Sequence, residues 1–280
     1  MTPGIGLALA AMLCFAAGDL IYKRAAAAGA ESALFIMLQS WVYCPSITLY
    51  AWLTGTLEPT VAALWGSLAG FFSFTAFYNF ARSLQGGAVS TNAPIFRLNF
   101  TLTAALAILL LGETLTAVKL AALACALVAV WLLLAEPGSA RPDWKSLTRV
   151  LVATVALGLA NLFFKMGVHG GAIPETMVAM QAWVFTSTST LMVLYRDKRL
   201  SLKPAIWPYS TPAAIVLVTS FVLLMHALAL GPASVLVPVA QMSFMPTALV
   251  GAAMFGEKLN WRKRYGLIAG VVSLALFAVS

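Results

Sequence analysis

Apolar stretches of about 20 residues recur along the whole chain and are separated by short polar breaks. A helix needs about that length to cross the ~30 Å hydrocarbon core of a bilayer. Stretches such as 120–134 are apolar on every face, whereas the strands of a membrane β-barrel alternate apolar and polar residues. The pattern predicts an all-α integral membrane protein with ten transmembrane helices, at about 4–24, 31–53, 60–82, 88–111, 115–135, 147–169, 174–194, 207–230, 233–255 and 263–279.

Composition agrees with lipid as the solvent and leaves no separate soluble domain. Of the 280 residues, 61% are hydrophobic and 9% are charged, against roughly 25% charged residues in soluble domains. The formal net charge of +8 comes from basic residues spread over many loops, which argues against a nucleic-acid partner. Cys14, Cys44 and Cys125 lie in apolar stretches without metal-ligand spacing, so we expect neither a metal nor a cofactor.

The basic residues separate by side when alternate loops between the expected helices are compared. Two of the 17 Lys and Arg residues, Lys119 and Lys165, fall on one side, and Arg97 lies inside a helix. The positive-inside bias assigns the other, basic side to the cytoplasm. Both termini are therefore expected on the non-cytoplasmic side of a cell inner (plasma) membrane. The basic side holds Lys23, Arg24, Arg82, Arg141, Lys145, Arg149, Arg196, Lys198, Arg199, Lys203, Lys258, Arg262, Lys263 and Arg264.

The chain also contains an internal repeat. A shift of 142 residues lays Asp19, Lys23, Gly29, Gln39 and Trp41 onto Asn161, Lys165, Gly171, Gln181 and Trp183. A shift of 144 lays Gly87, Ser90, Pro94, Phe100, Thr103, Gly112, Glu113 and Leu115 onto Gly231, Ser234, Pro238, Phe244, Thr247, Gly256, Glu257 and Leu259.

The repeat divides the chain into residues 1–136 and 147–280, with the polar stretch 137–146 as linker. Five helices in each half is an odd number, so the second half enters the membrane from the opposite face. Inverted repeats make the two faces nearly equivalent, and rocking of the packing then exposes a midplane site to each face in turn. The architecture favours a transporter that works by alternating access.

Two short motifs connect this architecture to a known family. Gly112-Glu113-Thr114-Leu115 and Gly256-Glu257-Lys258-Leu259 each close a fourth-type helix, and Pro94 or Pro238 lies inside the helix before each motif. With these features the chain resembles the drug/metabolite transporter (DMT) superfamily, in particular its EamA-like ten-helix exporters. The resemblance implies export of amino acids, related metabolites or drugs through a central cavity lined mainly by the first, third, fourth, sixth, eighth and ninth helices.

Arg97 is the leading candidate for contact with a solute, because an ionisable group near the bilayer midplane is costly and usually faces a wet interior. Its guanidinium can hold a carboxylate or phosphate bidentately. Asn92 and Asn99 lie on the same expected helix. The alternative is a structural cation, bonded to carbonyls near Pro94 or paired with Asp19.

A second group of candidates concerns gating or coupling. Asp19 and Lys23 are spaced for a pair within one helix or for a gate, and Asp19 alternatively takes up a proton that drives transport. The repeat places Asn161 at the position of Asp19 and keeps a lysine as Lys165. Arg82 corresponds to His226, and Arg82 either reaches lipid headgroups or contacts solute.

Further polar positions complete the set of expected site residues. Tyr78 and Asn79 lie one turn before Arg82, and Gln241 and Ser243 lie in the ninth helix. Pro238 and Pro246 predict that this helix is interrupted, which is the best sequence indication of a binding site in such proteins. For Glu113 and Glu257, which follow tight glycine turns, we expect each carboxylate to complement the dipole of the helix that it opens. Trp41, Trp183, Gln39 and Gln181 are expected mainly in packing.

These features predict a secondary transporter, with small-molecule solute and membrane lipid as partners and a proton as a candidate coupling ion; a monomer and a homodimer remain equal alternatives. A drug or organic-ion efflux carrier is the alternative function, followed by a non-transporting receptor or channel. An intramembrane enzyme is disfavoured, because we expect the two histidines, His169 and His226, on opposite sides of the membrane.

Overall fold

The computed structural model describes residues 3–83, 92, 95–134, 144–197, 200, 202–255 and 261–280. Throughout these ranges the regular structure is helical, without a strand. Pro94, Glu257 and most of the expected linker lie outside the described residues, and so does the side chain of Lys23.

Each half contributes a similar succession of helices. The first half contains α1 (Ile5–Ala27), α2 (Ser32–Leu53), α3 (Leu64–Ser83), α5 (Asn99–Leu111) and α6 (Ala117–Leu134). The second half contains α7 (Trp144–His169), α8 (Pro174–Asp197), the short 3-10 helix η1 (Pro204–Ile206), α9 (Trp207–Leu230), α10 (Ala233–Gln241), α11 (Phe244–Phe255) and α12 (Trp261–Val279).

Several of these helices are long and apolar enough to cross a membrane. Among the described residues five meet both criteria, within 5–22, 32–53, 144–169, 174–197 and 204–230. Shorter apolar helices cover Ile95–Leu111 and Ala117–Leu132. The chain is therefore a multi-pass helical membrane protein, and the expectation of ten crossings stays a prediction.

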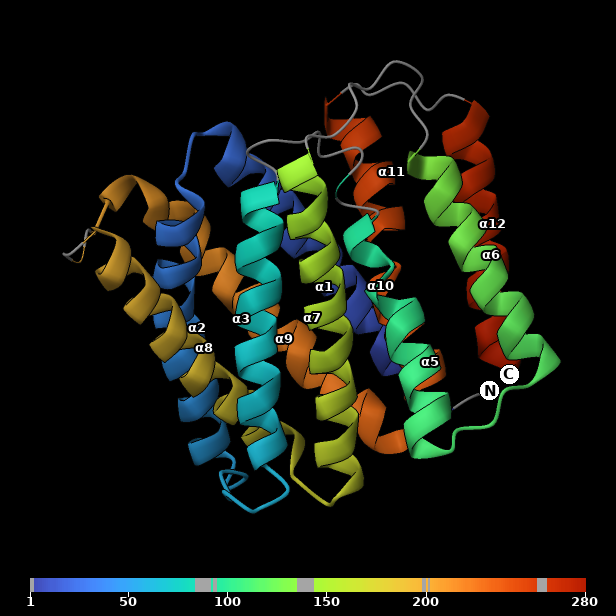
Figure 1. Ribbon diagram of the computed structural model, residues 1–280, viewed down its shortest axis with the longest axis horizontal. Coiled ribbons are helices and arrows are strands. Elements are labelled where there is room, and N and C mark those ends of the chain that lie inside the picture. Colours follow the sequence, from blue (N-terminus) through green and yellow to red (C-terminus); the bar gives the residue numbers. More distant parts are fainter. Residues whose placement is uncertain are drawn as a thin grey trace.

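The two halves interlock around a pseudo-twofold arrangement (Figure 1). α3 packs against α7 and α8, and its repeat counterpart α9 packs against α1 and α2. Two further main contacts pair an element with its own repeat counterpart, α2 with α8 and α6 with α12, and α5 packs against α10 of the other half. In Figure 1 the two ends of the chain are both drawn toward the lower ends of α6 and α12. Neither half therefore forms a separate body.

Small residues allow the closest of these helix contacts. A Cβ added to Gly66 would lie 2.6 Å from the carbonyl oxygen of Met177, and one added to Gly70 would lie 2.5 Å from that of Gln181. The backbones of α3 and α8 are thus so close at these two positions that only glycine, which has no Cβ, fits there. Such close contacts are typical of small-xxx-small packing between membrane helices. The repeat positions on α9, Ser210 and Ala214, are also small and fully buried.

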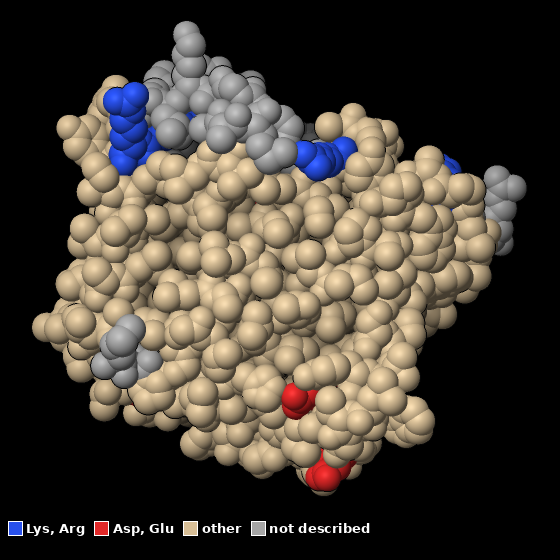
Figure 2. Space-filling view, turned by 180° about the vertical axis from the view of Figure 1, so that it is seen from behind, with Lys and Arg blue, Asp and Glu red and all other residues tan. Residues whose placement is uncertain are grey.

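Charged residues gather at the two ends of the bundle. On the face shown in Figure 2, Lys and Arg lie at one end, Asp and Glu lie toward the other, and a broad uncharged band separates them. This distribution is the one expected of a protein that crosses a membrane with its basic loops on one side.

One expectation about the ends of the helices is wrong. His169 ends α7 and His226 lies one turn before the end of α9. Lys165, one turn before His169, donates to the carbonyl of Leu228 at 2.8 Å, so both histidines lie at the same end of the bundle. The reason is parity: α7 and α9 are separated by a single helix and run in the same direction.

Candidate functional site

Two helix interruptions define the centre of the molecule. α10 ends at Gln241 and α11 begins at Phe244, so the ninth expected span is broken at Met242 and Ser243. In the first half the helical path is broken at Leu98, immediately before α5, and Leu98 is the repeat counterpart of Met242. The expected interruption of the ninth span is thus present, with Pro238 in α10 before it and Pro246 in α11 after it.

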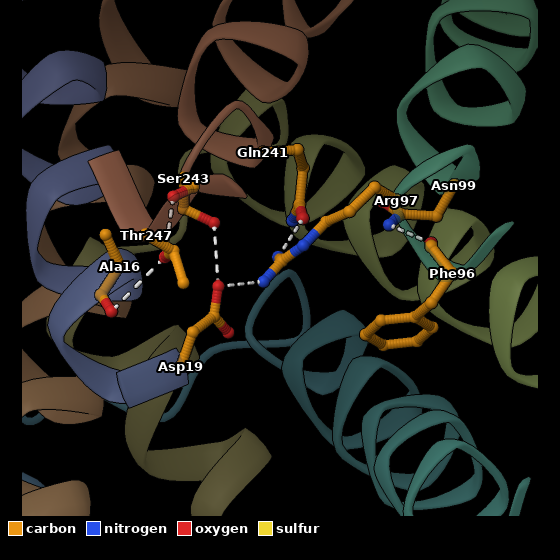
Figure 3. A network of polar contacts seen from close by, with 8 residues as sticks. All are labelled: Ala16, Asp19, Phe96, Arg97, Asn99, Gln241, Ser243 and Thr247. Carbon is orange, nitrogen blue, oxygen red and sulfur yellow. Dashed lines mark hydrogen bonds and ion pairs between the residues drawn. The ribbon is translucent and has the colours of Figure 1, made fainter. Parts of the chain in front are cut away.

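The residues next to these breaks meet in one polar network (Figure 3). Arg97 donates through one guanidinium nitrogen to Gln241 Oε1 at 3.0 Å and through another to Asp19. Ser243 donates to the same carboxylate oxygen of Asp19 at 3.3 Å. The Arg97 side chain is 12% exposed and that of Asp19 is 33% exposed. The network therefore joins α1 to both broken helices.

The network settles which of the expected structural partners Arg97 has in this conformation. It forms an ion pair with Asp19, 78 residues away in sequence. Gln241, the other partner of Arg97, is also the repeat counterpart of Arg97 and lies 144 residues further along the chain. Arg97 and Gln241 thus meet where the pseudo-twofold axis relates the two halves.

The second half repeats the frame of this network without its charges. Asn161, the counterpart of Asp19, donates to Asn99 Oδ1 at 3.2 Å. This contact corresponds to the one between Asp19 and Ser243, the counterpart of Asn99, with donor and acceptor exchanged. Thr103 donates to the carbonyl of Gly158 at 3.3 Å. Its counterpart makes the same contact, Thr247 to Ala16, at 3.4 Å. The centre therefore has one ionic and one neutral arm.

A narrow cavity is lined in part by Tyr22, which lies three residues after Asp19 on α1. Its volume is about 20 Å³, the space of roughly one water molecule. Two tyrosines hold its two glutamines: Tyr22 donates to Gln39, and Tyr43 donates to Gln181 Oε1 at 3.0 Å. The complete lining is Tyr22, Gln39, Ser40, Tyr43, Phe77, Gln181, Phe185, Leu217 and Phe221.

Sequence reasoning missed most of this lining. The cavity residues come from α1, α2, α3, α8 and α9, whereas the family resemblance implies the first, third, fourth, sixth, eighth and ninth helices. Tyr43 lies on α2 and Phe185 lies on α8, which are the second and seventh of the expected helices. Neither helix was expected to line the cavity. The identical repeat pair Gln39 and Gln181 was the available signal, since two buried amides at equivalent places need polar partners.

Several expected site residues lie outside the central network. Asn79 donates to Thr75 on its own helix at 2.9 Å, and Tyr78 stacks on Phe74. Arg82 is half-buried near the end of α3. Asn92 is fully buried and donates to the carbonyl of Ser83 at 3.0 Å and to Ser146 Oγ at 2.8 Å. In this conformation Asn92 joins α3 to the start of α7, and its contact with solute stays a prediction.

A second charged group holds the junction of α9 and α10. Lys165 donates to the carbonyls of Leu228 and Gly231 at 2.8 and 2.6 Å. The Glu113 carboxylate accepts the amides of Ala233 and Ser234 at 2.8 and 2.9 Å. A cation at a helix C-terminus and an anion at an N-terminus both complement the helix dipoles. Glu113 thus has the expected role, but it serves α10 of the other half and not the helix that it opens.

The same end carries one further contact. His226 Nε2 lies 2.8 Å from Glu175 Oε1, with the imidazole 42% exposed and the carboxylate 7% exposed. This contact joins α9 to the start of α8. Over the described residues, no group of three or more His, Cys, Asp or Glu side chains is arranged to hold a metal ion.

Interlocked repeats, apolar helices and a polar centre at two helix breaks define a multi-pass membrane protein of the transporter class. The EamA-like transporter family model matches residues 2–135 and 144–279. The chain belongs to this family, which confirms the resemblance to EamA-like members of the DMT superfamily. It is accordingly a membrane transporter of the DMT type, with a small-molecule solute as its partner.

A solved structure shares the fold. This crystal structure, described only as that of a protein, superposes with a TM-score of 0.80 at 13% sequence identity. The alignment covers 99% of this chain and 96% of the other. Among curated proteins, none matches this chain.

Proposed function

We propose that the protein is a secondary transporter that exports amino acids or related small metabolites by alternating access through its central cavity. The observation that carries the proposal is the Arg97–Asp19 ion pair, which lies where the two helix breaks meet. Charged residues inside an apolar bundle are costly to bury, and in membrane proteins they mark the pathway of a solute or ion. A polar solute at this place contacts elements of both halves at once.

The pseudo-twofold contacts support the alternating mechanism. Helices of one half pack mainly against helices of the other, so an exchange of conformation between the halves moves the centre relative to both ends. The cavity of about 20 Å³ is far below the roughly 300 Å³ of the smallest ligand pockets. Solute entry therefore requires the helices that line the cavity to part.

Charged residues near the ends of the helices are the candidate gates. Lys165 and His226 act at the end that holds the α9–α10 junction, where their bonds to Gly231 and Glu175 resist opening. Lys23 and Arg82 are their repeat counterparts and are assigned to the other gate. Asp19 is the candidate for proton coupling, because its counterpart is the neutral Asn161.

The orientation follows from the charge distribution. The basic end (Figure 2) faces the cytoplasm by the positive-inside bias. Both chain ends, which Figure 1 draws away from the basic loops, then face the outside of a cell inner membrane. With this orientation the α9–α10 junction forms the outer gate.

The aromatic cavity favours a second candidate function, the efflux of organic cations. Tyr43, Phe77 and Phe221 offer ring faces that attract a cation, and Asp19 offers a counter-charge. In that case a cationic drug competes with amino acids for the same centre.

Efflux from proteoliposomes tests these functions. Purified protein is reconstituted, the vesicles are loaded with a radiolabelled amino-acid panel or with an organic cation, and efflux is followed with and without a pH gradient. The proposal expects saturable efflux and counterflow of at least one amino acid. Flux that neither saturates nor shows counterflow identifies a channel, and efflux of the organic cation alone selects the second candidate.

A further inference from the structure

A buried oxygen in the neutral arm has no hydrogen-bond partner. Asn161, which is 1% exposed, donates from its amide nitrogen to Asn99 Oδ1 and Thr103 Oγ1. Its Oδ1 atom has no partner within the described part of the chain, whereas the carboxylate of its repeat counterpart Asp19 carries the ion pair with Arg97. Leaving a buried acceptor unpaired is costly, so this oxygen indicates a place for a ligand.

The symmetry of the centre indicates what kind of ligand belongs there. In the ionic arm, Asp19 lies against Ser243 and holds a cation, the guanidinium of Arg97. The repeat counterpart of Arg97 is Gln241, and Gln241 accepts from Arg97, so its side chain is engaged in the ionic arm. The neutral arm therefore repeats the frame that holds a cation, with a glutamine as the counterpart of the cationic residue.

The polar groups of the neutral arm suit an alkali-metal ion. Asn99 and Thr103 are fully buried, and Thr103 Oγ1 also lies 3.3 Å from the carbonyl oxygen of Gly158. When the amide of Asn161 turns about its terminal bond, its Oδ1 atom joins these oxygens. Neutral oxygens beside an interrupted helix bind Na⁺ in other membrane carriers. A divalent ion such as Ca²⁺ takes carboxylates, and none of these four groups is a carboxylate.

The spacing of these groups fits an ion of the size of Na⁺. Asn161 Nδ2 lies 3.2 Å from Asn99 Oδ1 and 3.4 Å from Thr103 Oγ1, and both distances exceed the ~2.9–3.0 Å of an ordinary hydrogen bond. Na⁺ is similar in size to Ca²⁺, whose ligand oxygens lie at about 2.3–2.6 Å, so neighbouring ligands at right angles are about 3.3–3.7 Å apart. After the amide turns, its oxygen takes the place of its nitrogen and comes close to this spacing.

We propose that the neutral arm is a binding site for Na⁺. Its ligands are the side-chain oxygens of Asn99, Thr103 and Asn161 and the backbone carbonyl of Gly158. The ion joins the start of α5 to the middle of α7, and so fixes the broken helix of one half against a helix of the other. This site goes beyond the proposed function, and only the use of the ion to drive transport rests on that function.

Thermal unfolding of the purified full-length protein in detergent tests the site without transport. NaCl is compared with choline chloride at equal ionic strength, because choline is too large for ligands at this spacing. A ligand that binds only the folded protein raises the unfolding temperature, and a shift of roughly 3 °C that saturates with Na⁺ is expected. Equal unfolding temperatures in the two salts, or an equal shift in KCl, overturn the inference.

Variants separate the ion site from a merely structural role of the same residues. Thr103→Val removes one ligand oxygen, so the Na⁺-dependent shift should disappear. Thr247→Val makes the matched change in the ionic arm and should keep the wild-type shift. Asn161→Asp adds a negative charge, and the Na⁺ concentration at half of the maximal shift should fall roughly 10-fold. An unchanged Na⁺ response in Thr103→Val and Asn161→Asp overturns the ligand assignment; if Thr103→Val does not fold, Asn161→Asp decides alone.

The Na⁺ response and the efflux assay separate this inference from the proposed function. A Na⁺-dependent shift in a protein that moves no amino acid retains the ion site and rejects the carrier. Efflux of amino acids by a protein without a Na⁺ response retains the carrier and rejects the ion site. Where both are found, an imposed Na⁺ gradient should change the rate of efflux in the wild type and not in Thr103→Val, and equal rates in the two proteins reject the coupling.

Discussion

The indole of Trp41 donates a hydrogen bond to Thr190 Oγ1 at 2.9 Å, and this bond joins α2 to α8. Its repeat image is also present: Trp183 donates to Thr48 Oγ1 at 2.9 Å. The two bonds connect the same pair of helices in opposite senses and are related by a shift of 142 residues at both donor and acceptor. The pseudo-twofold symmetry of the backbone thus extends to individual side-chain contacts between the halves.

This symmetry predicts that the two tryptophans contribute equally to stability. Trp41→Phe and Trp183→Phe each remove one hydrogen bond, so each is expected to lower the free energy of unfolding by about 1 kcal/mol. Trp41 and Thr48 are about 10 Å apart along α2 at 1.5 Å per residue, so the double variant should show the sum. Unfolding in detergent measures both effects, and Trp52→Phe, at an exposed position, is the control. Clearly unequal losses would show that the symmetry is only geometric.

The central ion pair predicts a particular pattern in a double-mutant cycle. Asp19→Asn and Arg97→Gln each leave one charge unpaired, and with Asp19 partly exposed the expected cost is about 2 kcal/mol for each. The neutral double variant should be more stable than either single variant, because no unpaired charge remains. Equilibrium unfolding of the four proteins gives the coupling energy. Additive losses would mean that the two charges do not depend on each other.

The α9–α10 junction predicts a local effect of Glu113. Glu113→Gln removes the anion that faces the amides of Ala233 and Ser234, and about 1 kcal/mol of stability is expected to go with it. Hydrogen exchange at these two amides should accelerate, whereas exchange in the middle of α9 stays unchanged. Glu58→Gln, an exposed carboxylate, serves as the control. Unchanged exchange at both amides would contradict the assigned contact.

The close approach of α3 and α8 predicts a steric effect at glycine. Gly70→Ala places a methyl group 2.5 Å from a backbone carbonyl, which forces the helices apart and should cost about 2 kcal/mol. Gly6→Ala on α1 is the matched control, since nothing lies within 4 Å of its added Cβ. Thermal unfolding compares the two. A harmless Gly70→Ala would mean that α3 and α8 separate easily.

The charge distribution predicts which positions a membrane-impermeant maleimide reaches from outside the cell. On a chain without Cys14, Cys44 and Cys125, new cysteines at Thr54 and Ser280 should react, whereas one at Ala28 should react only after the membrane is opened. Thr54 follows α2 and Ala28 follows α1, so they report on opposite ends of the bundle. The reverse pattern would reject the assignment of the basic end to the cytoplasm.

Much of the site follows from residues that the sequence already distinguishes. Arg97 and Asp19 are ionisable groups in apolar stretches, and Gln241 and Ser243 lie between two prolines, so each is unusual in its own segment. All four meet in the structure. The aromatic cavity does not follow in this way, because Phe77, Phe185 and Phe221 are ordinary residues for membrane helices and their convergence depends on how α3, α8 and α9 cross.

By itself the sequence determines that the chain lies in a membrane, that it contains a repeat, and which family it resembles. The apolar stretches, the residues repeated at a fixed shift and the paired Gly-Glu motifs can each be seen in the chain without knowledge of any contact. Only the tertiary structure decides which side chains meet: Arg97 with its repeat counterpart Gln241, and Glu113 with a helix of the other half. The physical reason is that helices of both halves interleave. A contact across them depends on direction and crossing angle, and neither is encoded in the spacing of residues along one helix.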